Sequence, residues 1–480
     1  MDFRPVLYIL GIFLSILAIS MVLPMLADIY WGNADWKVFF LCIVITAFFG
    51  GSLILSNAGL EISLSIRQAF MMTFLSWVGI SIFASLPLTL AGLNLSFTDA
   101  FFEAVSGITT TGSTVITGLD TAPPGILLWR SILQWLGGIG IIIMAMSVLP
   151  FLNVGGMQIF STELSESEKA LPRTAQLASS IGVIYIFMTI ACVLAYLFAG
   201  MGKFDALAHA MTTIATGGFS TYDASIAHFD SNLINSIAIF FMIMAGIPFV
   251  LYLKAVRGSL RPLVRDTQVR WFLGILIGSV LLTTFYLVIH NNMGFNEALM
   301  GAAFNLTSLL TGTGYATESY DQWGGFVLAM LFFLMAMGAC AGSTSCGIKI
   351  FRFEIFISVI RVQIQKLLHP HGTFVAHYNG KPIPEDVPLS VMSFLVLYAI
   401  CFIGLALALS AVGLDFITAL SGAMTSISNV GPGLGEVIGP AGNFSTLPDS
   451  AKWILSIGML LGRLEILAAF ILLHPSFWRH

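Results

Sequence analysis

Four short segments of this chain carry hydroxyl residues and glycine at one shared spacing. Each segment begins with Ser or Thr, has Ile or Leu two positions later and ends on a glycine four positions after that. The segments are 106–112, 212–218, 308–314 and 425–431. Extended Thr-Gly backbone can aim its carbonyl groups into a pore, where they replace the hydration shell of an ion, and glycine allows the dihedral angles that this requires. The four segments therefore predict one selectivity filter for a dehydrated monovalent cation.

The predicted filter consists of the last three residues of each segment. These residues are Thr110, Thr111, Gly112, Thr216, Gly217, Gly218, Gly312, Thr313, Gly314, Asn429, Val430 and Gly431. Glycine and threonine also fill tight helix contacts in ordinary membrane bundles, so one such loop alone is weak support for a filter. Four loops in register favour a filter over packing alone.

The composition excludes a soluble protein. Of 480 residues, 57% are hydrophobic and 9% are charged, against roughly 25% charged residues in soluble domains. Ten apolar runs are long enough to cross a membrane. They lie near 6–26, 38–55, 69–90, 125–151, 178–199, 233–253, 271–289, 325–356, 390–412 and 453–473. The first run is expected to stay as a helix, not to be removed as a signal peptide, and the five cysteines are expected to be buried free thiols.

Four shorter apolar segments lie between these runs, each directly ahead of one Gly-rich loop. They cover 97–109, 204–215, 295–311 and 416–428. Segments of this length fit helices that enter the membrane and return better than helices that cross it. After the first two runs the order is span, short helix, Gly-rich loop, span, four times over, at a period of about 100 residues. Such repetition predicts four equivalent walls around one axis.

This repetition divides the chain into six parts. They are an N-terminal two-helix pair (1–60), pore repeat one (61–155), pore repeat two (170–258), pore repeat three with an interrupted second helix (266–368), a cytoplasmic insert (369–387) and pore repeat four (388–480). Within the insert, Asn379-Gly380 between Val375 and Ile383 predicts a small hairpin.

The distribution of basic residues predicts the orientation. If the N-terminus is cytoplasmic, 15 of the 20 Lys and Arg residues lie on that side, as the positive-inside rule requires. The four Gly-rich loops then lie on the outer side, together with twelve acidic residues that include Asp99 and Glu103, and with Arg130 and Lys452. These acids either concentrate cations at the outer mouth or only solvate the loops.

The segment 337–347 interrupts the eighth apolar run. It holds three glycines and three hydroxyl residues in eleven positions, which disfavours an intact helix. Irregular backbone beneath a filter lines a cavity or blocks it. The stretch from Gly342 to Lys349 resembles a phosphate-binding loop in outline, but its lysine is displaced by one position and no Ser or Thr follows it. Nucleotide binding is therefore not expected here.

Arg463 lies near the middle of the last apolar run. A buried arginine costs at least about 2.5 kcal/mol even on a lenient insertion scale, so it needs acceptors. The carbonyl groups of the interrupted segment are the expected acceptors, in which case Arg463 holds that segment and adds an electrostatic barrier to cations. The alternative is an ion pair with Glu465, although residues two apart on a helix do not face each other.

With these features together, the sequence resembles the Trk/Ktr/HKT superfamily of potassium transporters. The resemblance rests on the four loops at 110–113, 216–221, 311–315 and 429–433, and it covers essentially all 480 residues. Two helices ahead of the first repeat, and Gly462-Arg463-Leu-Glu465, point to its bacterial TrkH branch. The resemblance implies an all-α polytopic membrane protein with four non-identical membrane-pore-membrane repeats around a pseudo-fourfold pore, plus two extra N-terminal transmembrane helices.

The resemblance also implies which ion passes. In the family, serine in place of the first filter glycine goes with sodium permeation, and Gly112 here favours potassium bound at the filter residues. Ser113, Asn429 and Pro432 depart from an ideal filter and make the ring asymmetric. The interrupted segment is implied to be a gate below the filter. The predicted gate residues are Gly338, Gly342, Ser343, Thr344, Ser345, Gly347, Lys349 and Arg463.

Several expectations about partners follow from the same resemblance. It implies a multi-pass protein of the bacterial inner membrane with a cytoplasmic N-terminus, and a homodimer in the lipid bilayer. It also implies a cytosolic nucleotide-binding regulatory subunit of the Trk type on the inner face, so that nucleotide acts only through the partner. No covalent cofactor, nucleic acid partner or enzyme activity is expected.

The predicted function is potassium uptake by a gated, channel-like transporter. The alternative is a secondary cation transporter coupled to protons or sodium, built on repeats with broken helices. The four parallel repeats favour the pore. A membrane enzyme would need paired intramembrane acids or His clusters, and His209 in the second short helix is expected only to be packed.

Overall fold

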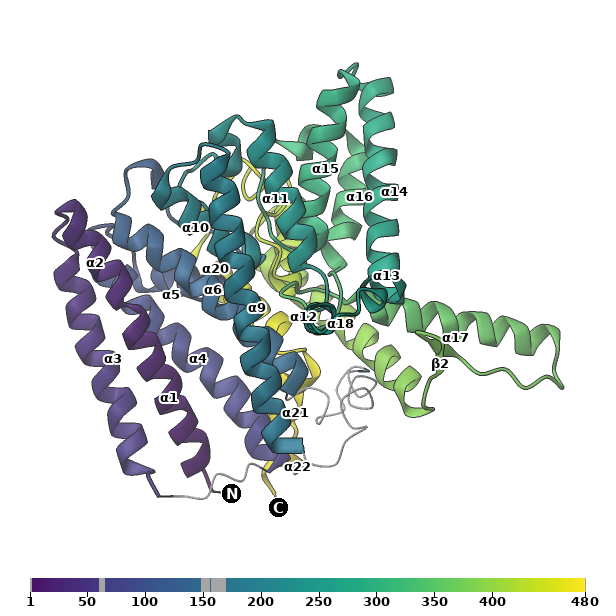
Figure 1. Cartoon of the computed structure of the whole chain (residues 1–480), viewed down its shortest axis with the longest axis horizontal. Coiled ribbons are helices and arrows are strands. Elements are labelled where there is room, and N and C mark those ends of the chain that lie inside the picture. The colour runs from purple at the N-terminus through teal and green to yellow at the C-terminus, as the bar shows by residue number, and fades with distance from the viewer. Residues whose placement is uncertain (1, 60–64, 148–155, 157–169, 480) are drawn as a thin grey trace.

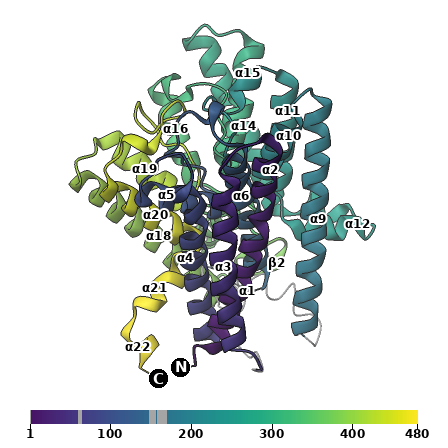
Figure 2. The same cartoon turned by 90° about the vertical axis from the view of Figure 1, so that its left-hand side faces the viewer.

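The computed structural model describes residues 2–59, 65–147, 156 and 170–479, and within them the fold is almost wholly helical. Seven of the described helices are long and apolar enough to cross a membrane, and nine if each of two bent pairs counts as one span. The protein is therefore a multi-pass membrane protein. Figures 1 and 2 place both termini at the same end of the molecule.

An N-terminal pair of spans packs at one edge of the molecule, drawn in purple in Figure 1. One span is α1 (Arg4–Ser20) followed by α2 (Val22–Trp31), and the other is α3 (Trp36–Ser56). The two spans touch backbone to backbone at Gly11 and Gly50, where a Cβ on Gly11 would lie 2.8 Å from the Gly50 carbonyl oxygen. Small residues allow this approach, as is usual between membrane helices.

Most of the rest of the described chain repeats one order of elements, long helix, short helix, 3-10 turn and helix, four times. Unit one consists of α4 (Ile66–Leu90), α5 (Phe97–Ile108), η1 (Leu119–Thr121) and α6 (Pro124–Ser147). Unit two consists of α9 (Ala170–Phe198), α10 (Lys203–Ile214), η2 (Ser225–Phe229), α11 (Asn232–Ala245) and α12 (Phe249–Val256). Unit three consists of α14 (Thr267–His290), α15 (Phe295–Thr311), η3 (Tyr320–Gln322), α16 (Gly325–Ala336) and α17 (Ile350–Leu368). Unit four consists of α18 (Asp386–Ala411), α19 (Phe416–Ser428), η4 (Phe444–Thr446), α20 (Asp449–Arg463) and α21 (Leu467–Leu473).

The four short helices α5, α10, α15 and α19 confirm the short helices predicted from the sequence, with bounds that differ by no more than one residue. Each begins beside an acidic residue, which suits the positive end of the helix dipole. These acids are Asp99, Asp205, Glu297 and Asp415. Each short helix is followed by an extended loop and then a 3-10 turn, an element that the sequence analysis did not predict.

The predicted break in the eighth run is confirmed, because α16 ends at Ala336 and α17 begins at Ile350. A bridge between Met337 and Ile348 closes the base of the segment between them. The prediction of ten full spans is wrong at the sixth and tenth runs. The helices α11 and α12 meet at 91° and α20 and α21 meet at 110°. Pro248 at the first bend lacks a backbone N–H, and Glu465 at the second has a φ of 57°.

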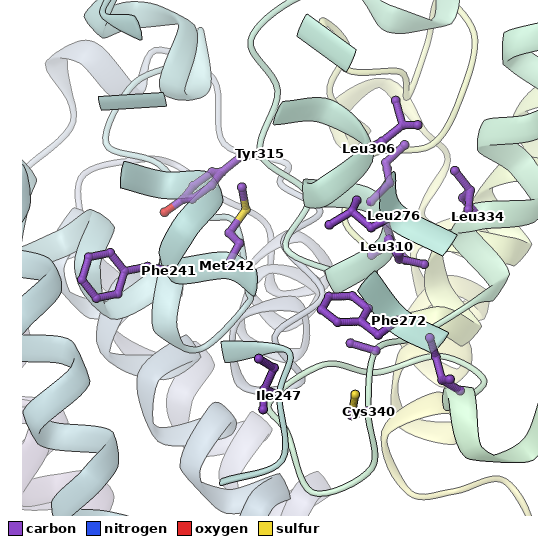
Figure 3. Packing of buried hydrophobic residues seen from close by; sticks show 14 of the residues in the cluster. Phe241, Met242, Ile247, Phe272, Leu276, Leu306, Leu310, Tyr315, Leu334 and Cys340 are labelled. Carbon is purple, nitrogen blue, oxygen red and sulfur yellow. The ribbon is translucent and has the colours of Figure 1, made fainter. Parts of the chain in front are cut away.

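Buried side chains from units two and three form the larger hydrophobic core. Figure 3 shows Leu306 and Leu310 of α15 close to Phe272 and Leu276 of α14, with Met242 of α11 nearby. All five side chains are nearly or completely buried. This packing holds the short helix of unit three in place, and so fixes the loop that follows it.

The remaining elements lie outside the four units. They are α13 (Arg261–Arg265), β1 (His377–Tyr378), β2 (Lys381–Pro382) and α22 (Pro475–Trp478). The predicted hairpin is confirmed: β1 pairs with β2, and Asn379 and Gly380 both have positive φ, as its two-residue turn requires. The predicted domain boundaries at 60, 61 and 155, and the end of the fourth run near 151, lie outside the described residues.

Candidate functional site

All four short helices end in the same hydrogen-bonded turn, which explains the shared spacing in the sequence. In each case the residue before the last glycine of the segment donates its backbone N–H to the carbonyl of the Ser or Thr that begins the segment. The bonds are Thr111 to Ser106 (2.8 Å), Gly217 to Thr212 (2.9 Å), Thr313 to Ser308 (2.8 Å) and Val430 to Thr425 (3.1 Å). This six-to-one bond is the mark of a Schellman motif, which ends a helix on a left-handed residue.

The left-handed residue is the same position in every loop, two residues before the final glycine. The φ angles are 55° at Thr110, 50° at Thr216, 74° at Gly312 and 53° at Asn429. The final glycines follow with φ of 89°, 77°, 82° and 107°. Each loop thus has two positive-φ residues separated by one residue that lacks a positive φ. A β-branched residue at positive φ is a genuine outlier, and such strain of about 1–3 kcal/mol is typical of functional sites.

The four loops approach one another in cyclic order. A Cβ added to the final glycine of each loop would overlap the carbonyl oxygen of the residue before the final glycine in the next loop. The distances are 2.1 Å from Gly112 to Gly217, 1.9 Å from Gly218 to Thr313, 2.1 Å from Gly314 to Val430 and 2.9 Å from Gly431 to Thr111. The fourth loop thus returns to the first. The predicted filter residues are brought together, and each final glycine is required by a neighbouring carbonyl.

Two side chains of α6 form hydrogen bonds with the loop of unit two. Gln134 donates from Nε2 to the Gly217 carbonyl at 2.6 Å and accepts the backbone N–H of Phe219 at 3.0 Å. Arg130 donates from NH1 to the Ser220 carbonyl at 2.8 Å. These bonds fix the distance between unit one and the loop of unit two.

A buried ion pair lies in the same region. Arg130 Nε is 2.8 Å from Glu103 Oε1, and both side chains are within 1% of full burial. The Glu103 carboxylate also accepts the Thr114 hydroxyl and the Val115 backbone N–H at 2.9 to 3.1 Å. Both residues were predicted to lie on the outer side among the charges of the loops. Their side of the membrane stays a prediction, but neither residue is a free or solvated loop charge, because α5 and α6 of one unit face each other and bury the pair between them.

Several other acids near the loops also have structural partners. Asp99 pairs with Lys452 at 2.5 Å, and Asp223 accepts the backbone N–H groups of Gly118 and Leu119. Burial raises the pKa of Glu318 and of Asp321 above the ordinary carboxyl value. Much of the predicted outer acidity therefore serves the loops themselves.

The interrupted segment between α16 and α17 contacts three of the four loops. The Thr216 hydroxyl donates to Thr344 Oγ1 at 3.2 Å, and the Thr110 hydroxyl lies 4.0 Å from Cys346 Sγ. A Cβ on Gly312 would lie 3.8 Å from the Cys346 backbone nitrogen. The segment is thus packed directly against the left-handed residues that begin the loops.

The segment is also anchored to the bend in unit two. Phe249 donates its backbone N–H to the Gly342 carbonyl at 2.9 Å, and Cys340 donates its own to the Gly246 carbonyl at 3.2 Å. The Ala341 N–H is accepted by Gln268 Oε1 at 2.9 Å. The bend between α11 and α12, which the sequence did not predict, therefore supplies two backbone partners of the segment, and Gln268 of α14 supplies a third.

Arg463, at the end of α20, is buried and joins this segment to α6. It donates from NH1 to Cys346 Sγ and from NH2 to the Gly137 carbonyl at 2.7 Å. The expected contact with the interrupted segment is present, but the expected acceptors were wrong: the segment offers a sulfur, and the carbonyl comes from α6. The pair with Glu465 was wrong as well, because Glu465 binds Arg352.

Three cations gather around the segment. Lys349 donates to the Ser345 carbonyl, and Arg352 both pairs with Glu465 and lies over the Phe394 ring at 3.7 Å. Together with Arg463, these residues make three buried cations. Among the contacts named here, Glu465 is their one acidic partner. The local charge opposes the presence of a further cation.

Two cavities flank the loops. A cavity of about 270 Å³ is lined by Gly112, Gly218, Gly314 and Pro432 among others. A second cavity of only about 20 Å³ is lined by residues of the interrupted segment with Arg463, which is room for about one water molecule. The site is therefore open on one face and nearly closed at the segment.

Two further expectations concern residues beside the site. His209 is fully buried, with Nδ1 2.9 Å from the Asp205 carbonyl and Nε2 2.9 Å from the Ser220 hydroxyl. It is packed, as predicted, and both ring nitrogens have partners. All five cysteines are buried and free, as predicted, although Cys346 also contacts Arg463.

Comparison with known proteins extends over the whole chain. The sequence model of a family described as TrkH, cation transport protein, matches residues 36–479. The chain is 46% identical over 477 residues to a Trk system potassium uptake protein, TrkI of Halomonas elongata, covering 99% of this chain and 97% of that protein. It is 37% identical over 491 residues to the Trk system potassium uptake protein TrkH of Escherichia coli (strain K12), covering all of both chains.

A solved structure is similar over the same length. The crystal structure of the potassium transporter TrkH from Vibrio parahaemolyticus superposes with a TM-score of 0.92 at 36% sequence identity and covers all of both chains. Sequence and fold therefore agree on one family.

Proposed function

Since the chain belongs to the TrkH family of cation transport proteins, we propose that it takes up potassium across the bacterial inner membrane through a gated, channel-like pore. Its relatives are Trk potassium uptake proteins, so the chain is an ion transporter and not an enzyme. We place the N-terminus in the cytoplasm, on the basis of the 15 basic residues that then lie on that side.

The cyclic order of the four loops is the single observation that carries this proposal. Each final glycine faces a carbonyl of the next loop, and the fourth loop returns to the first. The four short helices also point their C-terminal ends at these loops, and the C-terminal end of a helix carries partial negative charge. A potassium ion at the centre would exchange its water for carbonyl oxygens, including those of Thr111, Gly217, Thr313 and Val430.

Two of the three departures from an ideal filter, Asn429 and Ser113, form hydrogen bonds. Asn429 donates from Nδ2 to the Thr111 hydroxyl at 2.9 Å, and the Ser113 hydroxyl donates to the Gly431 carbonyl at 2.7 Å. Both bonds join the fourth loop to the first. At this junction the distance from an added glycine Cβ to the carbonyl oxygen of the next loop is the longest of the four, 2.9 Å. The polar side chains thus compensate for the loosest of the four junctions.

The interrupted segment is the proposed gate. Its contacts with Thr110 and Thr216, the small cavity beside it and the three buried cations support a closed state. Opening would require the segment to leave Arg463, which its glycines Gly338, Gly342 and Gly347 permit. Lys349 holds the segment in place by donating a hydrogen bond to the Ser345 carbonyl.

The proposal includes two partners, of which the regulatory subunit binds on the inner side. A second copy of the chain and a cytosolic nucleotide-binding regulatory subunit are expected from the family resemblance. The helix α17, which projects from the body in Figure 1, exposes Ile360, Ile364 and Leu367 along one face. With the hairpin of β1 and β2, this projecting helix offers an apolar surface for such a contact.

Ion flux into proteoliposomes tests the proposal against a coupled transporter. The purified chain is expected to pass potassium and rubidium under an imposed membrane potential alone, because a channel-like pore needs no coupling ion. Sodium and lithium serve as the comparison ions. Flux that required a proton or sodium gradient would instead establish a coupled secondary transporter. The broken helices are the observation that favours this alternative.

A further inference from the structure

An apolar cavity opens between the N-terminal pair and unit one, away from the proposed filter. It has a volume of about 320 Å³ and is lined by α1, α4 and α6, which is within the range of small-molecule sites. Its lining includes Phe13, Ile16, Met72, Trp77, Gly140 and Met144. None of these six residues belongs to the predicted filter or gate.

The chemistry of the lining determines what can occupy it. A buried water needs two to four polar partners, whereas the lining is apolar apart from Thr73, Ser76 and the Trp77 ring nitrogen. The Thr73 hydroxyl already donates to the Ala69 carbonyl at 2.8 Å. The Ser76 hydroxyl, which is buried without a hydrogen-bond partner among the described residues, and the Trp77 N–H remain. Together they suffice for one ordered water at most, so the occupant of most of the 320 Å³ must be apolar.

The mouth of the cavity faces the bilayer. Phe13 and Ile16 belong to a helix that is long and apolar enough to span a membrane, and their side chains are 36% and 47% exposed. The same surface that contacts lipid chains elsewhere along α1 therefore continues into the cavity. Hydrocarbon chains are the apolar molecules present there at the highest concentration.

The inner wall of the cavity also contacts the proposed gate. Trp77 lines the cavity, and the Arg463 guanidinium carbon lies 5.5 Å from the centre of its ring. Gly137 lines it as well, and its carbonyl accepts Arg463 NH2. An occupant that presses on these two residues stabilises the position in which Arg463 holds the interrupted segment.

We propose that this cavity binds one acyl chain of a membrane lipid and that the bound chain favours the closed gate. The binding part stands on the cavity alone, while the regulatory part rests on the proposed function of Arg463. Occupancy then makes ion flux sensitive to the shape of the lipid chains.

Gly140 allows a specific test of binding, because a Cβ on it would meet no atom within 4 Å and a larger side chain would extend into the cavity. The probe is a phosphatidylethanolamine with a photoreactive diazirine in mid-chain, in vesicles that hold the full chain. Peptide mapping is expected to find label at Phe13 and Met72, and most of it is lost in Gly140→Leu. The matched control is Gly404→Leu, also in open space on a lipid-facing helix, which should keep the label. Equal labelling of wild type, Gly140→Leu and Gly404→Leu would overturn the proposal.

Potassium flux tests the regulatory part. In vesicles of phytanoyl lipids, whose methyl branches make each chain wider than a linear one and so favour binding in the cavity less, wild type should pass about fivefold more potassium than in linear-chain vesicles. Gly140→Leu should show no such difference, and Gly404→Leu should behave as wild type. An equal response in Gly140→Leu and wild type would contradict the inference. Label without any potassium flux would instead count against the proposed function, and selective flux without label would count against this inference alone.

Discussion

Replacement of Gly112 by serine is expected to lower the ratio of potassium to sodium permeability by about tenfold, which corresponds to about 1.4 kcal/mol. The reason is steric. Gly112 has a φ of 89°, and a Cβ on it would lie 2.1 Å from the Gly217 carbonyl oxygen. The carbonyl must move, and the ring then loses the spacing that replaces the hydration shell of potassium. Reversal potentials in mixed potassium and sodium solutions measure the ratio.

A second glycine in the same loop provides the control. Gly118 also has a positive φ, of 73°, but the nearest atom to an added Cβ is 3.8 Å away. Gly118→Ser thus introduces the same kind of backbone strain without reaching a carbonyl of the next loop, and it should leave the permeability ratio unchanged. If Gly112→Ser also left the ratio unchanged, Gly112 would have no part in the filter.

Replacement of Arg463 by alanine is expected to raise potassium flux about tenfold, equivalent to a barrier lowered by about 1.4 kcal/mol, with no change in selectivity. Two effects combine, since the variant loses both the contacts with Cys346 and Gly137 and one of three buried cations. Deletion of 338–347 should also raise the flux, because it removes the segment itself while leaving all three cations in the chain. Rubidium uptake into proteoliposomes measures the flux.

Arg463→Lys separates the two effects. Lysine keeps the charge, but its single ammonium group cannot reproduce the planar guanidinium that reaches both acceptors. High flux in this variant would assign the barrier to anchoring, and low flux would assign it to charge. A change in selectivity without a rise in flux, in either alanine or deletion variant, would contradict the gate.

The sequence predicted the parts of the fold that depend on local pattern. The four short helices, the break between Ala336 and Ile350, and the hairpin at Asn379-Gly380 all follow from apolar run lengths and from glycine. The shared spacing of the four segments was also visible. Its structural cause was not, because a Schellman bond from Thr111 to Ser106 involves only backbone atoms.

The features that were missed depend on contacts between distant segments. Glu103 and Arg130 resemble loop charges until α5 packs on α6, and Arg463 could not be matched to Gly137, 326 residues away, from spacing alone. The positive φ of Thr110 and Thr216 contradicts their local preference. Only the surrounding ring can stabilise that conformation, so no local pattern predicts it.

The bends in the sixth and tenth runs were missed for a related reason. Each bent pair, taken as one stretch, is as long and as apolar as a continuous span. Yet the first bend supplies the Gly246 carbonyl to the interrupted segment, and the second leaves Glu465 facing Arg352. Tertiary partners, rather than composition, determine where these helices turn.

Anomalous diffraction from crystals grown in rubidium or thallium chloride tests the central claim most directly. The account predicts an anomalous peak enclosed by the carbonyl groups of Thr111, Gly217, Thr313 and Val430, weakened when potassium is added as a competitor and unaffected by lithium. Absence of any peak among the four loops, with the ion bound elsewhere in the membrane-spanning region, would contradict the assignment of these loops as one selectivity filter.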